Sequence, residues 1–175
     1  TTLGEKLARG AIDEVPDDLQ RQMYYQAISA AESAGMTQYG LSNFATADKV
    51  CEHNLTYWRN EPYIGVGPAA ASYVRTDRFT NLGDLSEYIN ALSGGRLPPR
   101  ESERLVGRQE MAETVMLALR LTQGLDRASF IRRFGMDVLE ALPRSIAYFT
   151  DMGALLVTES AVSIAKEYLF TSDGI

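Results

Sequence analysis

The residues best suited to ligand chemistry lie within eight consecutive positions of this 175-residue chain. They are its only cysteine, Cys51, its only histidine, His53, and its only tryptophan, Trp58. A thiolate and an imidazole two residues apart can bind a metal, and Trp58 with its neighbour Tyr57 offers flat aromatic surfaces. Two ligands are too few for a closed zinc site, which needs about four. The group therefore suits a planar aromatic ligand or a metal-bearing ring.

Each of these residues also has an ordinary structural interpretation. Trp58 can anchor a local core, and His53 can hydrogen-bond the backbone. A nucleophilic site is not indicated, because the sequence has no second histidine and Cys51, Glu52 and His53 are too close to be aimed at one another. We therefore predict no catalytic residue, and both interpretations of His53 stay open.

Polar residues stand at the end of a predicted strand that precedes this group. A helix that stops at Gly35 is followed by the strand Thr37 to Phe44, as in an α/β unit. The ends of such strands carry ligand sites, so Ser42 and Asn43 are candidate binding residues. The alternative is that these two residues merely start a turn.

Two glycines mark a second candidate strand, from Tyr63 to Gly67. Gly65 and Gly67 have no side chain over the backbone, so they permit a ligand or a neighbouring strand to approach closely. The pair is too short for a dinucleotide-binding fingerprint, which needs a third glycine that opens a helix.

The elements that must position these residues are predicted to be helices and short strands. A capping-box-like start at Asp17 predicts a helix over 17–34, and Asp84 starts another helix. Short strands are expected at 69–74 and 78–81. The first part of the chain is therefore a mixture of both kinds of element.

The chain changes character at the Leu97-Pro98-Pro99 segment, where we place a boundary between domains at residues 1–97 and 98–175. Helices are predicted after this joint, with one strand at 154–158 and a last helix striped by apolar residues over 161–169. The second part has the pattern of a small winged-helix-type bundle.

Charge disfavours a DNA-binding winged helix. The candidate groove-facing helix, Asp137 to Met152, is nearly neutral or acidic, and Arg127, Arg132 and Arg133 form the only basic cluster of the sequence. The formal net charge is −6, and acidic surfaces do not attract phosphate backbones. We expect no nucleic-acid partner.

Composition narrows the class of protein further. Hydrophobic residues make up 45% and charged residues 23% of the chain, which is ordinary for a folded soluble protein. No apolar run approaches the roughly 20 residues that span a bilayer, and the first residues lack the features of a secretory signal. We therefore expect a cytoplasmic protein without a transmembrane segment. One cysteine excludes an internal disulfide.

A longer ordered string of residues surrounds the cysteine, histidine and tryptophan. It consists of Tyr39, Ser42, Asn43, Phe44, Ala45, Cys51, His53, Asn54, Tyr57, Trp58, Tyr63, Gly65, Gly67, Ala70 and Ser72. This string resembles the second half of the oxygen-independent coproporphyrinogen III oxidase family of radical S-adenosylmethionine proteins, and especially its haem-chaperone branch. The segment from Leu119 to Asp126, with Phe130 and Phe134-Gly135, is similar to the C-terminal domain of that family.

The resemblance implies an α+β fold. In this expectation residues 1–97 are the C-terminal part of a radical-SAM-type α/β barrel, and residues 98–175 are a helical, winged-helix-like C-terminal domain. It implies a C-terminal fragment that binds haem or a related tetrapyrrole, with His53 on the haem iron. The implied binding residues are Ser42, Asn43, Cys51, His53, Asn54, Tyr57, Trp58, Gly65 and Gly67.

The alternative is that the chain is part of the oxidase, which carries out oxidative decarboxylation in porphyrin biosynthesis and needs the cluster-bearing half. The full-length family uses S-adenosylmethionine and a 4Fe-4S cluster held by a Cys-x-x-x-Cys-x-x-Cys motif. That motif is absent from this sequence, and cluster ligation needs several cysteines. We expect neither a cluster in this chain nor enzyme activity from it alone.

Three positions depart from the family pattern. Gly40 stands where the family has glutamate, Ala69 where it has glycine, and Ala71 where it has histidine. A carboxylate and an imidazole are thus lost from segments that border the cofactor and substrate region in the family, so we expect binding to survive better than chemistry. A half barrel also leaves unpaired strand edges, which we expect a second copy of the chain or rearranged helices to cover.

Overall fold

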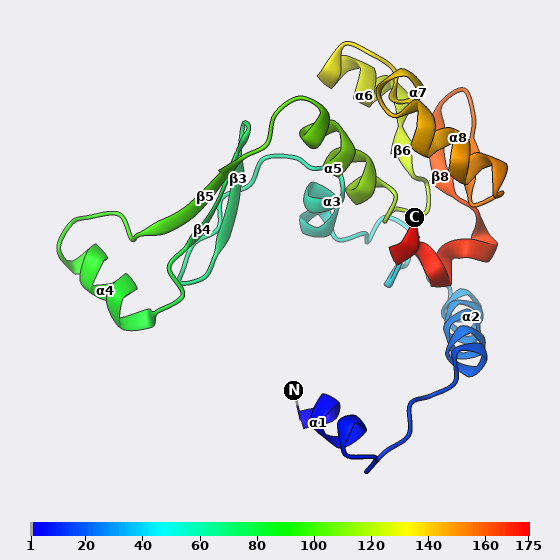
Figure 1. Ribbon diagram of the computed structural model, residues 1–175, viewed down its shortest axis with the longest axis horizontal. Helices are drawn as coiled ribbons and strands as arrows, with labels where there is room; N and C mark the ends of the chain where they lie inside the picture. The colour runs from blue at the N-terminus through cyan, green and yellow to red at the C-terminus, as the bar shows by residue number, and fades with distance from the viewer. Residues whose placement is uncertain (1) are drawn as a thin grey trace.

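The computed structural model describes residues 2–175 as a mixed helix and strand fold with an elongated outline (Figure 1). The first part contains α1 (Thr2–Ala8), α2 (Asp17–Ser33), β1 (Thr37–Gly40), β2 (Asn43–Ala45), α3 (Glu52–Trp58), β3 (Ala71–Val74), β4 (Asp77–Asn81), α4 (Leu85–Ser93) and β5 (Arg100–Arg104). The second part contains α5 (Arg108–Ala118), β6 (Leu125–Asp126), α6 (Arg127–Phe134), α7 (Val138–Ala141), α8 (Pro143–Asp151), β7 (Leu155–Val157), β8 (Ala161–Ile164) and the 3₁₀ helix η1 (Lys166–Gly174).

The segment predicted as one strand, from Thr37 to Phe44, is a hairpin of two short strands. β1 and β2 pair antiparallel, and the chain reverses at Leu41-Ser42. The Tyr24 hydroxyl and the side-chain Nε2 of Gln38 both donate to the Leu41 carbonyl oxygen, each at 2.9 Å. The single-strand prediction was wrong because this reversal is held by a tyrosine from α2, which local periodicity does not reveal.

The hairpin also joins the first part of the chain to the second. The Leu41 amide donates to the Arg120 carbonyl at 2.9 Å, and the Thr122 amide donates to the Tyr39 carbonyl at 3.1 Å. Helix α3, which follows the hairpin, packs against α5. As a result α3 lies in the middle of the molecule, between the β3–β5 sheet and the second part (Figure 1).

β3, β4 and β5 form an antiparallel sheet that extends away from the helices of the second part, with α4 at its far end (Figure 1). β4 pairs with β5 from Asp77 opposite Arg104 to Asn81 opposite Arg100. The prediction that helices begin after Pro98-Pro99 was therefore wrong up to Arg104, because pairing with a distant strand is not visible in local composition. The division into residues 1–97 and 98–175 stays a prediction.

The second part is built around one hydrophobic core. A three-stranded antiparallel sheet of order β6-β8-β7 packs with α5 to α8. The buried core residues are Val115, Ala118, Leu119, Leu125, Phe130, Val138, Ala141, Ile146, Leu155, Val162, Ile164 and Leu169. The apolar stripe over 161–169, predicted as one helix, is strand β8 followed by η1. A short apolar run is compatible with the period of a helix and with that of a strand. Here residues 161–164 form a strand because they pair with β6 on one side and β7 on the other.

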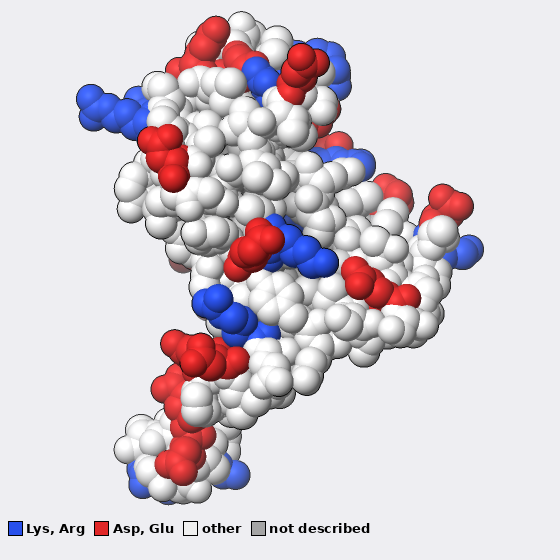
Figure 2. Space-filling model, turned by 90° about the vertical axis from the view of Figure 1, so that its right-hand side faces the viewer, with Lys and Arg blue, Asp and Glu red and all other residues white. Residues whose placement is uncertain are grey.

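Two properties of the whole molecule bear on its partners. Among the described residues, no helix combines the length and the apolar character needed to cross a membrane. On the face drawn in Figure 2, lysine and arginine side chains are scattered among acidic ones and do not form a continuous basic patch. The absence of a nucleic-acid partner stays a prediction.

Candidate ligand-binding site

Helix α3 carries two rings of an aromatic row. His53 and Tyr57 are one helical turn apart, and their ring centroids lie 4.8 Å apart at an interplanar angle of 85°. Tyr57 meets Tyr63 of the following loop in the same edge-to-face manner, with centroids 4.5 Å apart at 70°. We call His53, Tyr57 and Tyr63 the ring cluster. His53 is exposed at its outer end, so a ligand can reach the imidazole from solvent.

The ring cluster leads to a cavity of about 460 Å³, which we call the aromatic cavity. Its lining residues are Tyr57, Trp58, Asn60, Tyr63, Tyr73, Arg78, Glu113, Met116 and Leu117. These residues come from α3, the loop after it, β3, β4 and α5. A space walled by aromatic rings and apolar side chains with a few polar groups is typical of a small-molecule site. His53 is not among the lining residues and stands beside the cavity.

Trp58 lies against Arg120, with the guanidinium carbon 4.9 Å from the ring centroid. Trp58 Nε1 and Arg120 Nε are buried and have no hydrogen-bond partner within residues 2–175. Buried donors without a partner are uncommon in folded proteins. A ligand oxygen or a water molecule would satisfy them.

The polar residues predicted for the site take up structural contacts. Asn54 Nδ2 donates to Asn43 Oδ1 at 3.0 Å and contacts the Tyr39 hydroxyl at 3.4 Å. The backbone N–H of Cys51 donates to the same hydroxyl at 3.4 Å, and the Cys51 thiol is exposed. The structure thus brings Asn43, Asn54 and Cys51 together where α3 meets the hairpin. Ser42 is exposed in the turn of the hairpin, and a binding role for these residues stays a prediction.

The two glycines admit a neighbouring backbone. A Cβ built on Gly65 would come within van der Waals overlap of the Ala71 carbonyl oxygen, and the Gly65 amide donates to Ser72 Oγ at 3.0 Å. Gly67 has φ +120°, and its amide donates to the Tyr88 hydroxyl at 3.1 Å. Of the strand predicted over 63–67, Tyr63 pairs with Tyr73 in an isolated bridge. Of the two roles considered for these glycines, the contacts at Gly65 favour close approach of a neighbouring strand.

Burial raises the pKa of two cavity tyrosines. Desolvation is the largest influence on both Tyr63 and Tyr73, and it raises each pKa above the ordinary phenol value. For Tyr73 the Arg133 guanidinium acts in the opposite direction, by favouring the phenolate, but burial prevails. An ordinary phenol is already neutral near pH 7, and the raised pKa keeps both hydroxyls as hydrogen-bond donors to a higher pH.

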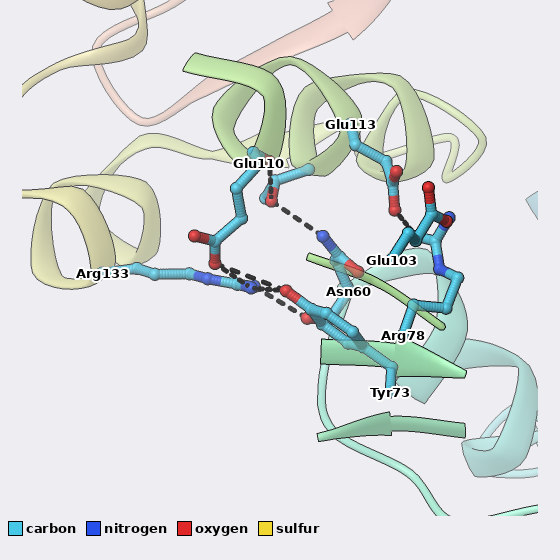
Figure 3. A network of polar contacts seen from close by, with 8 residues as sticks. Asn60, Tyr73, Arg78, Glu103, Glu110, Glu113 and Arg133 are labelled. Atoms are coloured by element: carbon cyan, nitrogen blue, oxygen red, sulfur yellow. Dashed lines mark hydrogen bonds and ion pairs between the residues drawn. The ribbon is translucent and has the colours of Figure 1, made fainter. Parts of the chain in front are cut away.

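A network of polar contacts fixes the back of the aromatic cavity (Figure 3). Arg133 of α6 donates from Nη1 to the Asn60 carbonyl oxygen at 2.7 Å. Its Nη2 lies 3.0 Å from the Tyr73 hydroxyl and 2.8 Å from Glu110 Oε1. Asn60 Nδ2 donates to Thr114 Oγ1 at 3.0 Å. One arginine thus connects α6 with α5, β3 and the loop after α3.

Asn60 also ends α3. Its φ is +51°, in the left-handed region, its N–H donates to the Tyr57 carbonyl, and the Glu61 N–H donates to the Thr56 carbonyl, both at 2.9 Å. These two bonds form a Schellman motif, in which asparagine is the usual alternative to glycine. Asn60 and Arg133 were not predicted to belong to the site. The tolerance of asparagine for the left-handed region was a usable signal for Asn60.

The residues present suit haem better than an iron–sulfur cluster. Haem iron needs an axial ligand from the protein, because the porphyrin supplies the equatorial ones, and the exposed imidazole of His53 can serve. A cluster needs several thiolates, whereas Cys51 is the single cysteine of the sequence. No group of three histidine, cysteine, aspartate or glutamate side chains that could hold a metal gathers anywhere in residues 2–175.

Comparison with known proteins gives consistent matches. Residues 106–165 match the family model described as HemN C-terminal domain. Heme chaperone HemW of Bacillus subtilis is 30% identical over 161 residues, which are 92% of this chain and 42% of that protein. Heme chaperone HemW of Mycobacterium tuberculosis is 32% identical over 128 residues, 73% of this chain and 33% of that protein. The chain spans less than half the length of the curated relatives it matches.

A solved structure extends the likeness to the fold. Coproporphyrinogen III oxidase (HemN) from Escherichia coli, described as a radical SAM enzyme, superimposes with a TM-score of 0.63 over 85% of this chain and 38% of that chain. The sequence identity is 14%, so this likeness concerns the fold alone.

Proposed function

This chain belongs, as a C-terminal portion, to the coproporphyrinogen III oxidase-like family of radical S-adenosylmethionine proteins, and from that premise we propose that it binds a tetrapyrrole in the manner of a haem chaperone. The observation that carries the proposal is the ring cluster of α3 and the loop after it, beside the aromatic cavity. The haem-chaperone names of the relatives give it the ligand class.

The binding role of each residue follows from its position. The exposed His53 imidazole ligates the haem iron, and Cys51, two residues before it and also exposed, is the competing ligand. Tyr57 stands directly beside His53, so its ring packs against a ligand held there. Trp58 and Tyr63 extend the aromatic surface toward the cavity.

The wider organisation is proposed on the same basis. We assign residues 1–97 to a segment of a radical-SAM-type α/β barrel, which the fold likeness supports, and residues 98–175 to a winged-helix-like domain, which the β6-β8-β7 sheet with its helices supports. S-adenosylmethionine and the 4Fe-4S cluster belong in this proposal to the full-length family. The alternative, a part in coproporphyrinogen oxidation, has in its favour the fold of the Escherichia coli enzyme and the match of residues 106–165 to the HemN C-terminal domain.

Titration with haem, followed by ultraviolet–visible absorption, tests the proposal. The wild type should develop a defined Soret band. His53→Ala should lose this band and bind haem about tenfold more weakly, a loss of about 1.4 kcal/mol in binding free energy. Cys51→Ala should keep the band. Spectra that are the same in all three proteins would remove His53 from the site, and loss of the band in Cys51→Ala alone would make the thiolate the ligand.

A further inference from the structure

Helix α3, which bears His53 and Tyr57 of the ring cluster, is too short to be stable by itself. α3 has seven residues, and isolated helices this short are not stable in water. Its start is fixed to the hairpin by Asn54, as described above. Its end is fixed by Asn60, two residues after Trp58, and Asn60 is in turn held by groups from the second part of the chain.

Arg133 is the centre of that attachment. Its two terminal nitrogens reach Asn60 at the end of α3, Tyr73 in β3 and Glu110 in α5 (Figure 3). Asn60 and Tyr73 both line the aromatic cavity, whereas Arg133 does not. The guanidinium therefore holds two walls of the cavity from behind.

The chemistry of the contact suits an arginine and no other residue. The planar guanidinium can donate several bonds in fixed directions at once, whereas a lysine ammonium is a point charge. The Glu110 carboxylate, with its side chain 14% exposed, compensates the charge of Arg133, which is 29% exposed. Hydrogen bonds to a charged donor contribute more than neutral ones, so the attachment is a strong one for its position.

We propose that Arg133 is a positioning residue: through Asn60 and Tyr73, helix α6 of the second part sets the place of α3 and thereby the geometry of the aromatic cavity. For the ligand this rests on the proposed tetrapyrrole function, but the attachment of α3 is a property of the free protein. Trp58 is the only tryptophan, and it lines the cavity next to the anchored end of α3. Its fluorescence reports the position of α3 without any ligand.

The test compares Arg133→Lys with Arg132→Lys in the full chain. Arg132 is the neighbouring arginine on α6, and its Nη2 donates to the Ser129 hydroxyl, one turn earlier on the same helix, at 2.6 Å. Arg133→Lys should shift Trp58 emission to longer wavelength and increase its quenching by acrylamide severalfold, while circular dichroism stays that of a folded protein. Haem affinity should fall about tenfold. Arg132→Lys should leave both readouts at wild-type values.

The outcomes separate the two proposals. If Trp58 emission and quenching are the same in Arg133→Lys and Arg132→Lys, the positioning role is wrong, whatever happens to haem affinity. If Trp58 responds as expected but the wild type binds no haem, the positioning role stands and the tetrapyrrole proposal fails. Should Arg133→Lys not fold, Glu110→Gln removes the charge partner of Arg133 while keeping its shape, and a Trp58 signal unchanged there also overturns the proposal.

Discussion

At the scale of single residues, Ala69 is held in an unfavourable backbone conformation. Its φ is +57°, in the left-handed region where the Cβ of an L-residue crowds the following carbonyl. Its N–H donates to the Leu82 carbonyl at 3.1 Å, so the surrounding structure keeps the residue in place. The family pattern has glycine here, which adopts this conformation without the steric cost.

We predict that Ala69→Gly raises the free energy of unfolding by up to about 1 kcal/mol, because relief of the left-handed strain exceeds the entropy cost of glycine. Urea denaturation measures the change. Ala70→Gly is the matched control, because Ala70 is not among the residues with positive φ. Ala70→Gly should lower the free energy of unfolding by about 0.5–1 kcal/mol. Equal losses in both variants would contradict the expectation.

At the scale of elements, the short helix α7 depends on one aspartate. Asp137 Oδ1 accepts a bond from the Leu139 amide at 2.9 Å, and Asp137 Oδ2 lies 2.7 Å from Arg127 Nη2. The hydrogen bond from Arg127 is the largest influence on this carboxyl, followed by that from the Leu139 amide, and together they hold its pKa below the ordinary aspartate value. The same side chain thus caps α7 and connects it to α6.

A pH dependence follows from the lowered pKa of Asp137. A folded pKa below the unfolded value of about 3.9 gives stability that is fully present above that value and is lost as the pH falls through the folded pKa. We predict that Asp137→Asn is less stable than wild type at pH 7 and that the difference shrinks below about pH 4. Thermal unfolding from pH 7 to 3 measures both. A gap that persists undiminished at pH 3 would show that the loss does not come from the charge of Asp137.

The ion pair between Arg127 and Asp137 can be measured separately from the cap. Arg127→Gln and the double variant complete a cycle with Asp137→Asn, which isolates the coupling between the two side chains. The coupling should be favourable at pH 7 and weaken as the pH falls below about 4.

At the scale of the whole molecule, the β3–β5 sheet presents an edge strand to solvent. All five residues of β5 are exposed, and no other strand of residues 2–175 pairs with its outer edge. If two copies paired antiparallel about Ser102, Arg100 would face Arg104 and Glu101 would face Glu103. Like charges directly opposite each other destabilise a strand pair. The charge order therefore protects this edge from self-pairing, as edge strands commonly require.

We predict that the double variant Glu101→Lys with Arg104→Glu self-associates more strongly than the wild type, because the same pairing then places opposite charges face to face. The two substitutions keep the contact of Arg100 with the Phe79 ring and the ion pair between Glu103 and Arg78. Sedimentation velocity at several concentrations measures the association. A wild-type dimer with amide exchange protection over 100–104 would show that the edge is an interface after all, as the expected second copy requires.

Much of this molecule could be predicted from local sequence, because its signals act over a few residues. Asp84 was expected to start a helix, and its carboxylate accepts the Glu87 backbone N–H at 2.8 Å. The strands expected at 69–74 and 78–81 are β3 and β4. The family resemblance was confirmed. It depends on the order of residue types along the chain, which can be read without knowing the fold.

The candidate site was only half predictable from sequence. Residue type and spacing singled out His53, Tyr57 and Trp58 as one group, but helix α3, which places His53 and Tyr57 one turn apart, was not predicted. The sequence does not show that Tyr63 and Tyr73 join them at the aromatic cavity, or that Arg133 holds Asn60 from 73 residues away. Such contacts, like the pairing of β5 and β8, depend on which distant surfaces meet, and the tertiary structure alone decides that, through burial and hydrogen bonding that no local pattern encodes.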